Sequence, residues 1–302
     1  MNKRDFLKLG TAGMVPGLAA GLLPAAARSA GSEVQLRWLG GATLEIEAAG
    51  LRILTDPCLG EGAEAFRMPD PNEMFDLAKG PEVKMHARLT PFPGLGHAAY
   101  DLVLLSHAHE DHFDQKAQAW LGRKLPLLCS AHDAGALAQK GFAAQALAHG
   151  AARRFEAPAG RVTVTALPAV HSLSPRVSQI LGLGNGYLID VEAAGVRKRI
   201  YWAGDSFLAG PVAAALDAQP APDLFIPHIG AVGGSGALGP ISMSGAEAAE
   251  FAAQLAPGAV LPVHHSTYAL YQEGPEGLRA HHAAAQPAWQ LLMPAEGAQI
   301  AV

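Results

Sequence analysis

Positions 106 to 114 read Ser-His-Ala-His-Glu-Asp-His-Phe-Asp, so three histidines and an aspartate fall within six consecutive positions, 107 to 112. The four residues before this stretch, 102–105, are all apolar and have the length and composition of a buried strand. After the cluster, Asp114 is suited to cap a helix over residues 115–122. The histidines are therefore predicted to lie on a turn between a strand and a helix, at the carboxyl end of the strand.

Such a turn can direct several side chains into one space, and the spacing indicates a metal site. His107 and His109 could share one metal ion, while Asp111 and His112 face the neighbouring position. Zinc prefers nitrogen and oxygen ligands of this kind, and a catalytic site leaves one position open for water. A histidine-rich surface loop is the alternative interpretation, but a regular His-x-His-x-Asp-His spacing at a strand end is far more specific than a lone histidine.

This spacing resembles the signature of the metallo-β-lactamase superfamily. The resemblance implies an α/β (α+β) fold, a four-layer αββα sandwich with a one- or two-metal site along one edge of its sheets. It also implies that further ligands stand downstream, each at the end of a strand. His171, Asp205 and His264 fit that expectation, because each directly follows a segment that is predicted to be a strand.

The resemblance implies a complete set of ligands for two divalent ions, zinc in the first place, with manganese or iron as alternatives. In that set one ion is held by His107, His109 and His171, the other by Asp111, His112 and His264, and Asp205 bridges the two. His265 competes with His264, but the register of comparable proteins implies that His264 is the ligand and that His265 lines the pocket.

The first part of the chain resembles one branch of the superfamily, which includes the ascorbate-phosphate lactonases and the N-acyl-phosphatidylethanolamine phospholipase D group. The resemblance rests on residues 38–43 and 53–57. It implies that Asp56 supports the metal loop from behind, whereas the residues alone also allow a plain Asp-Pro turn.

Strand and helix patterns recur along the rest of the chain. Strands are predicted over residues 34–39, 43–47, 51–55, 125–130, 161–167, 186–191, 199–203, 223–227, 259–263, 290–293 and 299–302. Helices are predicted over residues 131–140, 211–218, 244–255 and 275–285, the third of them opened by a capping box of Ser244 and Glu247.

Two long stretches, residues 58–100 and 172–185, lack periodicity and are rich in proline and glycine. Loops of such length inside a compact domain usually form lids or binding loops, so both are expected near the site. Arg176 could hold a phosphate or a carboxylate there, or be a surface arginine. In the first stretch, His86 and Arg88 are the polar residues that could act near the site, but solvated loop residues are the favoured interpretation.

Composition limits the class of protein. The chain has 302 residues with 50% hydrophobic residues and a formal net charge of -5, which allows one large core or two small ones. It has no basic block, so nucleic acid is not an expected partner, and no apolar run outside the N-terminus is long enough for a stable membrane span. Cys58 and Cys129 are expected to be small core residues, with a disulfide as the alternative.

The first 30 residues have the plan of an export signal, with a basic start and an apolar middle before small residues. The start, residues 3–8, resembles a twin-arginine signal with lysine in place of the first arginine. Cleavage is expected near residues 27–31, which would leave residues 31–302 as one exported, periplasmic or extracytoplasmic domain. A disordered or amphipathic tail is the alternative.

The predicted chemistry is hydrolysis of an ester, a lactone or a phosphodiester in a small-molecule or lipid-like substrate by a metal-bridged hydroxide. Asp111 can also orient the nucleophile, and His265 and Tyr268 are candidate proton donors. A mononuclear iron oxygenase of the same fold and an exported metal-binding protein without turnover are the alternatives. Residues 234–239 satisfy Gly-x-Gly-x-x-Gly, but Pro240 follows and no helix begins there, which excludes a dinucleotide site.

Overall fold

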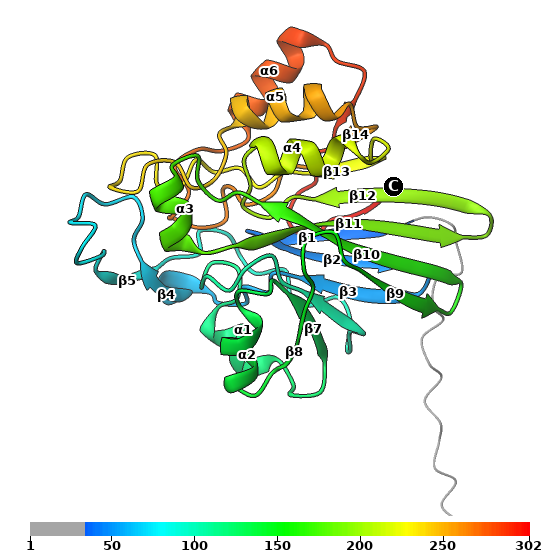
Figure 1. Cartoon of the computed structure of the whole chain (residues 1–302), viewed down its shortest axis with the longest axis horizontal. Helices are drawn as coiled ribbons and strands as arrows, with labels where there is room; N and C mark the ends of the chain where they lie inside the picture. The colour runs from blue at the N-terminus through cyan, green and yellow to red at the C-terminus, as the bar shows by residue number, and fades with distance from the viewer. Residues whose placement is uncertain (1–33) are drawn as a thin grey trace, which may run out of the picture.

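A computed structural model describes residues 34–302, and the predicted export signal lies outside the described residues. Within them, two seven-stranded sheets stack face to face (Figure 1). The first sheet has the order β16 (Gln299–Ala301), β1 (Gln35–Gly40), β2 (Thr43–Ala48), β3 (Leu51–Thr55), β6 (Leu102–Leu104), β7 (Pro126–Cys129) and β8 (Ala143–Ala146). The second has the order β15 (Gln290–Leu291), β14 (Ala259–Val260), β13 (Leu224–Ile226), β12 (Val196–Trp202), β11 (Gly184–Ala193), β10 (Gly160–Ala169) and β9 (Ala152–Ala157).

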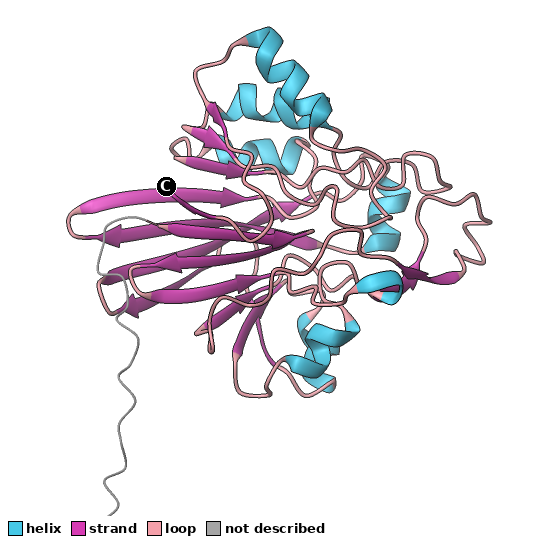
Figure 2. Ribbon diagram, turned by 180° about the vertical axis from the view of Figure 1, so that it is seen from behind, coloured by secondary structure: helices cyan, strands magenta, loops and turns pink. Residues whose placement is uncertain are grey.

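Helices cover the outer face of each sheet, so the predicted four-layer αββα sandwich is confirmed (Figures 1 and 2). The first sheet is covered by α1 (Gln115–Trp120) and α2 (Ala134–Gln139). The second is covered by α4 (Gly210–Asp217), α5 (Gly245–Leu255) and α6 (Glu276–Ala285). As predicted, Asp114 caps α1 by accepting from the Ala117 backbone amide, and Ser244 and Glu247 form a capping box on α5.

Three hydrophobic clusters fill the three interfaces between these four layers. Strand β6 contributes to two of these clusters. Leu102 and Leu104 face the other sheet, whereas Val103 and the following Leu105 face the helices. Because β6 pairs in parallel with β3 and β7 and is buried on both faces, its sequence is a continuous apolar run rather than an alternating one.

The two stretches without periodicity contain structure that the sequence analysis did not predict. The first carries a short hairpin of β4 (Phe66–Pro69) and β5 (Val83–His86), which projects from the sandwich (Figure 2). The second carries α3 (Pro175–Leu181), which Ser174 caps, with Pro175 in the first turn. The Ser174-Pro175 pair is a helix-start signal that could have predicted α3. Strands β4 and β5 have four residues each and pair only with each other, so the sequence contains little pattern that would predict them.

Strands β8 and β9 were also missed, because the first is made of alanine and glutamine and the second is mostly exposed. The two cysteines are confirmed as buried core residues, and both are free thiols, so the alternative of a disulfide is wrong. Within residues 34–302, no helix combines the length and the hydropathy that a membrane span requires.

Candidate metal centre

The strand directions bring the predicted ligands to one edge of the sandwich. In the second sheet, β12 runs parallel to β13 and β14, and β10 runs in the same direction because both β10 and β12 are antiparallel to β11. In the first sheet, β3 and β6 are parallel. The carboxyl ends of these strands carry Asp56 after β3, residues 106–112 after β6, His171 after β10, Asp205 after β12, His228 after β13 and His264 after β14.

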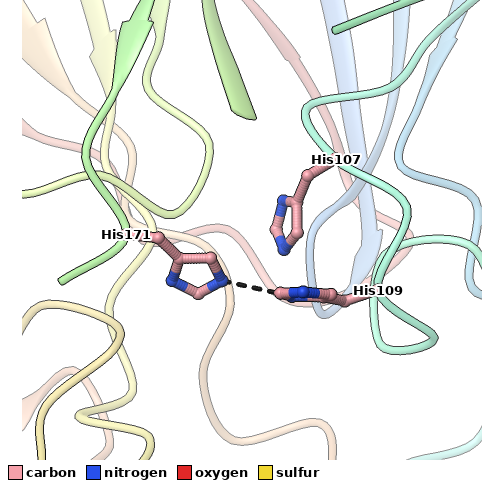
Figure 3. Close-up of side chains that lie close together, drawn as sticks. All are labelled: His107, His109 and His171. Atoms are coloured by element: carbon pink, nitrogen blue, oxygen red, sulfur yellow. Dashed lines mark hydrogen bonds between the residues drawn. The ribbon is translucent and has the colours of Figure 1, made fainter. Parts of the chain in front are cut away.

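His107, His109 and His171 form the first group of ligating side chains (Figure 3). Their ligand atoms all lie within 4.8 Å of one another. Nε2 of His171 lies 3.2 Å from Nδ1 of His109, and the rings of His107 and His109 are 4.4 Å apart between centroids. Residues from the two sheets thus meet in one space.

Asp111, His112, Asp205 and His264 form the second group, again with all ligand atoms within 4.8 Å of one another. Nε2 of His264 lies 3.4 Å from Oδ2 of Asp111, and Nε2 of His112 lies 3.4 Å from Oδ2 of Asp205. That same Asp205 oxygen is 3.8 Å from Nε2 of His171. Asp205 therefore lies between the two groups, and all seven predicted ligands come together.

Hydrogen bonds behind the cluster set the tautomers of its histidines. The Nδ1 atoms are held by the Ile241 carbonyl for His171 (2.6 Å), the Ile229 carbonyl for His264 (2.9 Å), the Asp56 carboxylate for His112 (2.7 Å) and the Ser106 hydroxyl for His107 (3.0 Å). A carbonyl or a carboxylate can only accept, and the Ser106 hydroxyl accepts from His107 because it donates its own proton to Asp56. In each neutral ring, Nδ1 therefore carries the proton and Nε2 is left with a free lone pair. His109 is the exception, since its Nδ1 faces the cluster.

The buried imidazole nitrogens without a hydrogen bond test whether the cluster fits a metal. Nε2 of His107 and Nε2 of His112 are both buried and make no hydrogen bond within the described part of the chain. A buried polar atom without a partner is costly. A divalent cation among these lone pairs and carboxylates would satisfy both nitrogens, so the donor set fits a metal centre.

Electrostatics favour the forms that bind metal. Burial, then the neighbouring His171, lowers the pKa of His109 to about 4, and burial with the charges of His112, His109 and His171 holds the pKa of His107 well below its usual value. Burial alone would raise the pKa of Asp205, but His264 and His112 outweigh it and hold that pKa well below the ordinary range. Neutral imidazoles and ionised carboxylates are the ligating states.

His112 is different, because three carboxylates surround it. Burial opposes its protonation, but Asp205, Asp111 and Asp56 outweigh burial and raise its pKa well above the usual value in the metal-free protein. Metal binding at His112 must therefore displace a proton.

Asp56 lies directly behind the cluster, where the resemblance implies it. Its Oδ1 accepts from the Ser106 amide at 2.7 Å, and its Oδ2 accepts from the Ser106 hydroxyl at 2.5 Å and from Nδ1 of His112. Its backbone φ is +30°, a conformation that aspartate and asparagine tolerate better than most residues. Asp56 thus ties the metal-loop turn to β3.

Two buried residues at the centre were missed by the sequence analysis. His228 donates from Nδ1 to Oδ1 of Asp205 at 3.0 Å while its Nε2 accepts from the Trp202 indole, and burial lowers its pKa to about 3. Its signal was available, since it follows β13 as His171 follows β10. Tyr271 packs its ring 4.6 Å from that of His264 between centroids and buries a hydroxyl that makes no hydrogen bond in residues 34–302.

Several other expectations are corrected. His265 does not line the pocket, because left-handed backbone at His264 and Ser266 turns it onto Trp38, with 4.8 Å between ring centroids. Tyr268 is buried and donates to the Cys58 carbonyl at 3.3 Å, so its hydroxyl is not placed to reach a substrate.

His86 and Arg88 are buried rather than solvated. His86 stacks on Phe66, and Arg88 pairs with Glu296 at 2.6 Å. Arg176 is exposed in the first turn of α3 and does not line the pocket. None of the three is placed to hold a substrate anion.

A cavity of about 230 Å³ opens onto the cluster. Its polar base, here called the floor, consists of His109, Glu110, Asp111, His171 and Asp205. Its apolar sides, here called the walls, consist mainly of Met68, Pro69, Pro71, Phe75, Leu77, Pro81, Ile180, Leu181, Val232, Leu238 and Ile241. The two irregular stretches therefore do wall the site, as expected, and Glu110 lines the floor.

Comparison with known proteins is consistent with this geometry. The family profile described as "Beta-lactamase superfamily domain" matches residues 51–265. A UPF0173 metal-dependent hydrolase of Natranaerobius thermophilus is 31% identical over 169 residues, which are 56% of this chain and 66% of that protein. A second, from Listeria welshimeri, is 30% identical over 180 residues, which cover 58% of this chain and 72% of that protein.

Solved structures resemble the whole sandwich. An isothiocyanate hydrolase from Delia radicum gut bacteria superposes with a TM-score of 0.71 at 22% identity, covering 89% of this chain and 99% of that one. A possible metal-dependent hydrolase from Veillonella parvula gives a TM-score of 0.72 at 18% identity with the same coverage. At these identities the similarity shows the fold.

Proposed function

The chain belongs to the beta-lactamase superfamily, and from that premise we propose that it is a metal-dependent hydrolase whose buried cluster holds two divalent ions, zinc in the first place. The observation that carries the proposal is the convergence of seven ligating side chains with two buried imidazole nitrogens that make no hydrogen bond in the described chain. The curated relatives are themselves named metal-dependent hydrolases. The bond cleaved is proposed to be an ester, a lactone or a phosphodiester.

Each part of the site has a role in this proposal. When bound, divalent metal lowers the pKa of water and polarises the oxygen of the bond under attack. Asp111, at the floor, orients the attacking water. Asp205 holds the two groups of ligands together, and His228 fixes the carboxylate of Asp205 by a hydrogen bond. The apolar walls exclude bulk water, which strengthens every electrostatic interaction at the floor.

The proposal extends to the location of the protein. The basic start and apolar middle of the first 30 residues support export and removal of that segment, which would release residues 31–302 as the mature hydrolase. Sequencing the N-terminus of the protein recovered from the periplasmic fraction should find a start near residues 27–31. Recovery of only uncleaved chain from the cytoplasm would contradict export.

Turnover by metal-loaded protein tests the hydrolase proposal. The full chain, purified without a chelator, should cleave at least one of 4-nitrophenyl hexanoate, a simple lactone and bis(4-nitrophenyl) phosphate, and a chelator should stop the reaction. The proposal fails if protein that carries its metal cleaves none of these three classes.

A further inference from the structure

The proposed ligand His264 has an unusual backbone conformation. Its φ is +64°, and that of Ser266 is +60°, a left-handed region that is uncommon for residues other than glycine. Backbone of this kind persists only where the surrounding contacts enforce it. We infer that the ion pair of Arg88 and Glu296 enforces it. Acting through Thr267, these two positioning residues hold His264 where it can ligate. The inference rests on the proposed function, because it concerns the second group of ligands at the same metal centre.

Residues 264–267, here called the ligand loop, lie on the tight turn between β1 and β2. The His264 amide donates to the Gly41 carbonyl at 2.8 Å, and the Gly41 amide donates to the Thr267 hydroxyl at 2.7 Å. These two hydrogen bonds fix both ends of the loop on one residue. A Cβ atom on Gly41 would lie 2.8 Å from the Tyr268 ring, so this close approach requires glycine.

Glu296 orients the Thr267 hydroxyl. Oε1 of Glu296 accepts from that hydroxyl at 2.6 Å, which leaves the lone pairs of the hydroxyl facing the Gly41 amide. Oε2 of Glu296 accepts from Nη2 of Arg88 at 2.6 Å and from the Thr90 hydroxyl at 2.8 Å. Both carboxylate oxygens are engaged, so the side chain of Glu296 cannot rotate without breaking one of these bonds.

Arg88 holds the carboxylate of Glu296 from the other side. The side chain of Arg88 is fully buried, and its Nη2 also donates to the Leu39 carbonyl at 2.7 Å. The amide of the next residue, Leu89, donates to the Thr267 carbonyl at 2.7 Å. Because the desolvation of a buried ion pair offsets much of its attraction, placement of the ligand loop accounts for this pair better than stability alone.

The Arg88–Glu296 pair acts on one group of ligands. Of the seven ligands, His264 alone belongs to the ligand loop. His107, His109 and His171, which form the first group, follow β6 and β10 instead. Loss of the pair should therefore weaken the ion of the second group and leave the ion of the first group in place.

Glu296→Gln breaks the pair with little change in shape. An amide has one accepting oxygen and one donating nitrogen, so it cannot accept from Thr267 and Arg88 on its two sides. Cobalt(II) titration of the full chain, followed by visible absorption against a competing chelator, should find two equivalents in the original protein. In the variant, one equivalent should bind about tenfold more weakly and the other within twofold.

Asp190→Asn is the matched control. Asp190 pairs with Arg199 at 2.7 Å between β11 and β12, both side chains are 10% exposed, and neither belongs to the ligand loop or the cavity lining. Both variants leave a largely buried arginine without its carboxylate and should unfold at lower urea concentration. The control should bind both equivalents within twofold of the original protein. Equal weakening of cobalt binding in the two variants, or unchanged binding in Glu296→Gln, would overturn the inference.

Thr267→Val and Thr267→Ser test the same contacts in metal-free protein. Valine removes the hydroxyl that Gly41 and Glu296 share, whereas serine keeps it. Hydrogen exchange of the His264 amide should be at least about tenfold faster in Thr267→Val and close to the original rate in Thr267→Ser. Equally slow exchange in both variants would contradict the role of Thr267.

Turnover of 4-nitrophenyl hexanoate and bis(4-nitrophenyl) phosphate by the original protein separates this inference from the proposed function. Selective weakening of one equivalent in Glu296→Gln, without hydrolysis of either compound, would support the inference and contradict the hydrolase proposal. Hydrolysis by the original protein, with both equivalents unchanged in Glu296→Gln, would support the hydrolase and overturn the inference. A chain that binds no cobalt would overturn both.

Discussion

The floor and the walls of the cavity differ in chemistry and in how firmly they are held. Floor residues stand at strand ends, are largely buried, and are oriented by hydrogen bonds such as that from His171 to the Ile241 carbonyl. Among the wall residues, Phe75 and Ile180 come from a projecting hairpin and a short helix and are only partly covered, whereas Val232 and Ile241 are buried. The difference indicates that the floor residues carry out the reaction and that the wall residues determine substrate specificity.

The largest effect on catalysis is expected from removing a metal-ligating side chain of the floor. Asp205→Ala should reduce kcat/KM for every substrate by at least about a thousandfold, because the catalytic contribution of metal is several kcal/mol and each 1.36 kcal/mol is tenfold in rate. Steady-state kinetics on esters and phosphodiesters measure this. Asp217→Ala, an exposed aspartate on α4, is the control and should leave the kinetics unchanged. A loss confined to one substrate class would break the division between floor and walls.

A smaller effect is expected from the residue behind the floor. Asp56→Asn keeps the size of the side chain and tolerates the left-handed backbone, but it turns one acceptor into a donor. If that amide faces Nδ1 of His112, the imidazole must switch tautomer and its Nε2 can no longer ligate. Competition with a chromophoric chelator should show metal affinity weakened by about 10- to 100-fold. Unchanged affinity would mean that Asp56 supports the turn without tuning the ligand.

The metal ligands could be predicted from the sequence for a physical reason. A metal ligand must sit at a fixed strand end, so the ligands at 107–112, 171, 205 and 264 leave a local signal of an apolar run followed by His or Asp. His228 carries the same signal and was not assigned, because local pattern alone does not separate a ligand from the partner of a ligand. His265 was misplaced, since its direction depends on left-handed backbone at Ser266 that no local propensity announces.

The walls of the cavity could be predicted only in part from the sequence. Their position near the site follows from long stretches without periodicity, but their structure depends on nonlocal contacts. Strands β4 and β5 pair only with each other, and Phe75 and Leu77 line the cavity together with segments more than 100 residues away, such as α3 and Leu238. Residues that are half-exposed and that pack against distant segments show no hydrophobic period.

The walls should give a moderate effect of a different kind. Phe75→Ala should raise KM for 4-nitrophenyl hexanoate by roughly tenfold, because it removes part of the ~1.5–3 kcal/mol that a fully buried apolar side chain contributes, while kcat stays within about twofold. Met74→Ala is the matched control, since Met74 is 79% exposed and does not line the cavity. A fall in kcat with unchanged KM would show that Phe75 acts in the catalytic step, which would contradict the assignment of substrate binding to the walls and catalysis to the floor.

The smallest effect on catalysis is expected at His265, which is adjacent to a ligand but belongs to neither floor nor walls. Burial, then the neighbouring His264, lowers the pKa of His265 to about 4. Between pH 6.5 and 4 the unfolded chain therefore binds a proton at this residue that the folded chain does not. The free energy of unfolding should fall as pH falls, by about 1.4 kcal/mol per pH unit from this one group.

His265→Phe tests that sign, because it keeps a ring against Trp38 and removes the titration. Urea unfolding of metal-free protein at pH 7 and pH 5 should show a smaller loss of stability in the variant than in the original chain. Metal content and kcat/KM at pH 7 should stay within about twofold. An equal pH dependence in both proteins would show that His265 is not the group responsible.

The central claim is that the cluster of seven histidine and aspartate side chains at the base of the cavity holds metal. Metal content per chain tests this claim most directly. Elemental analysis of full-length protein, purified without a His tag or a chelator, should find about two divalent ions per chain, and the His109→Ala variant should lose them while keeping its fold. A well-folded chain that contains no metal, or a variant that keeps its metal, would contradict the claim.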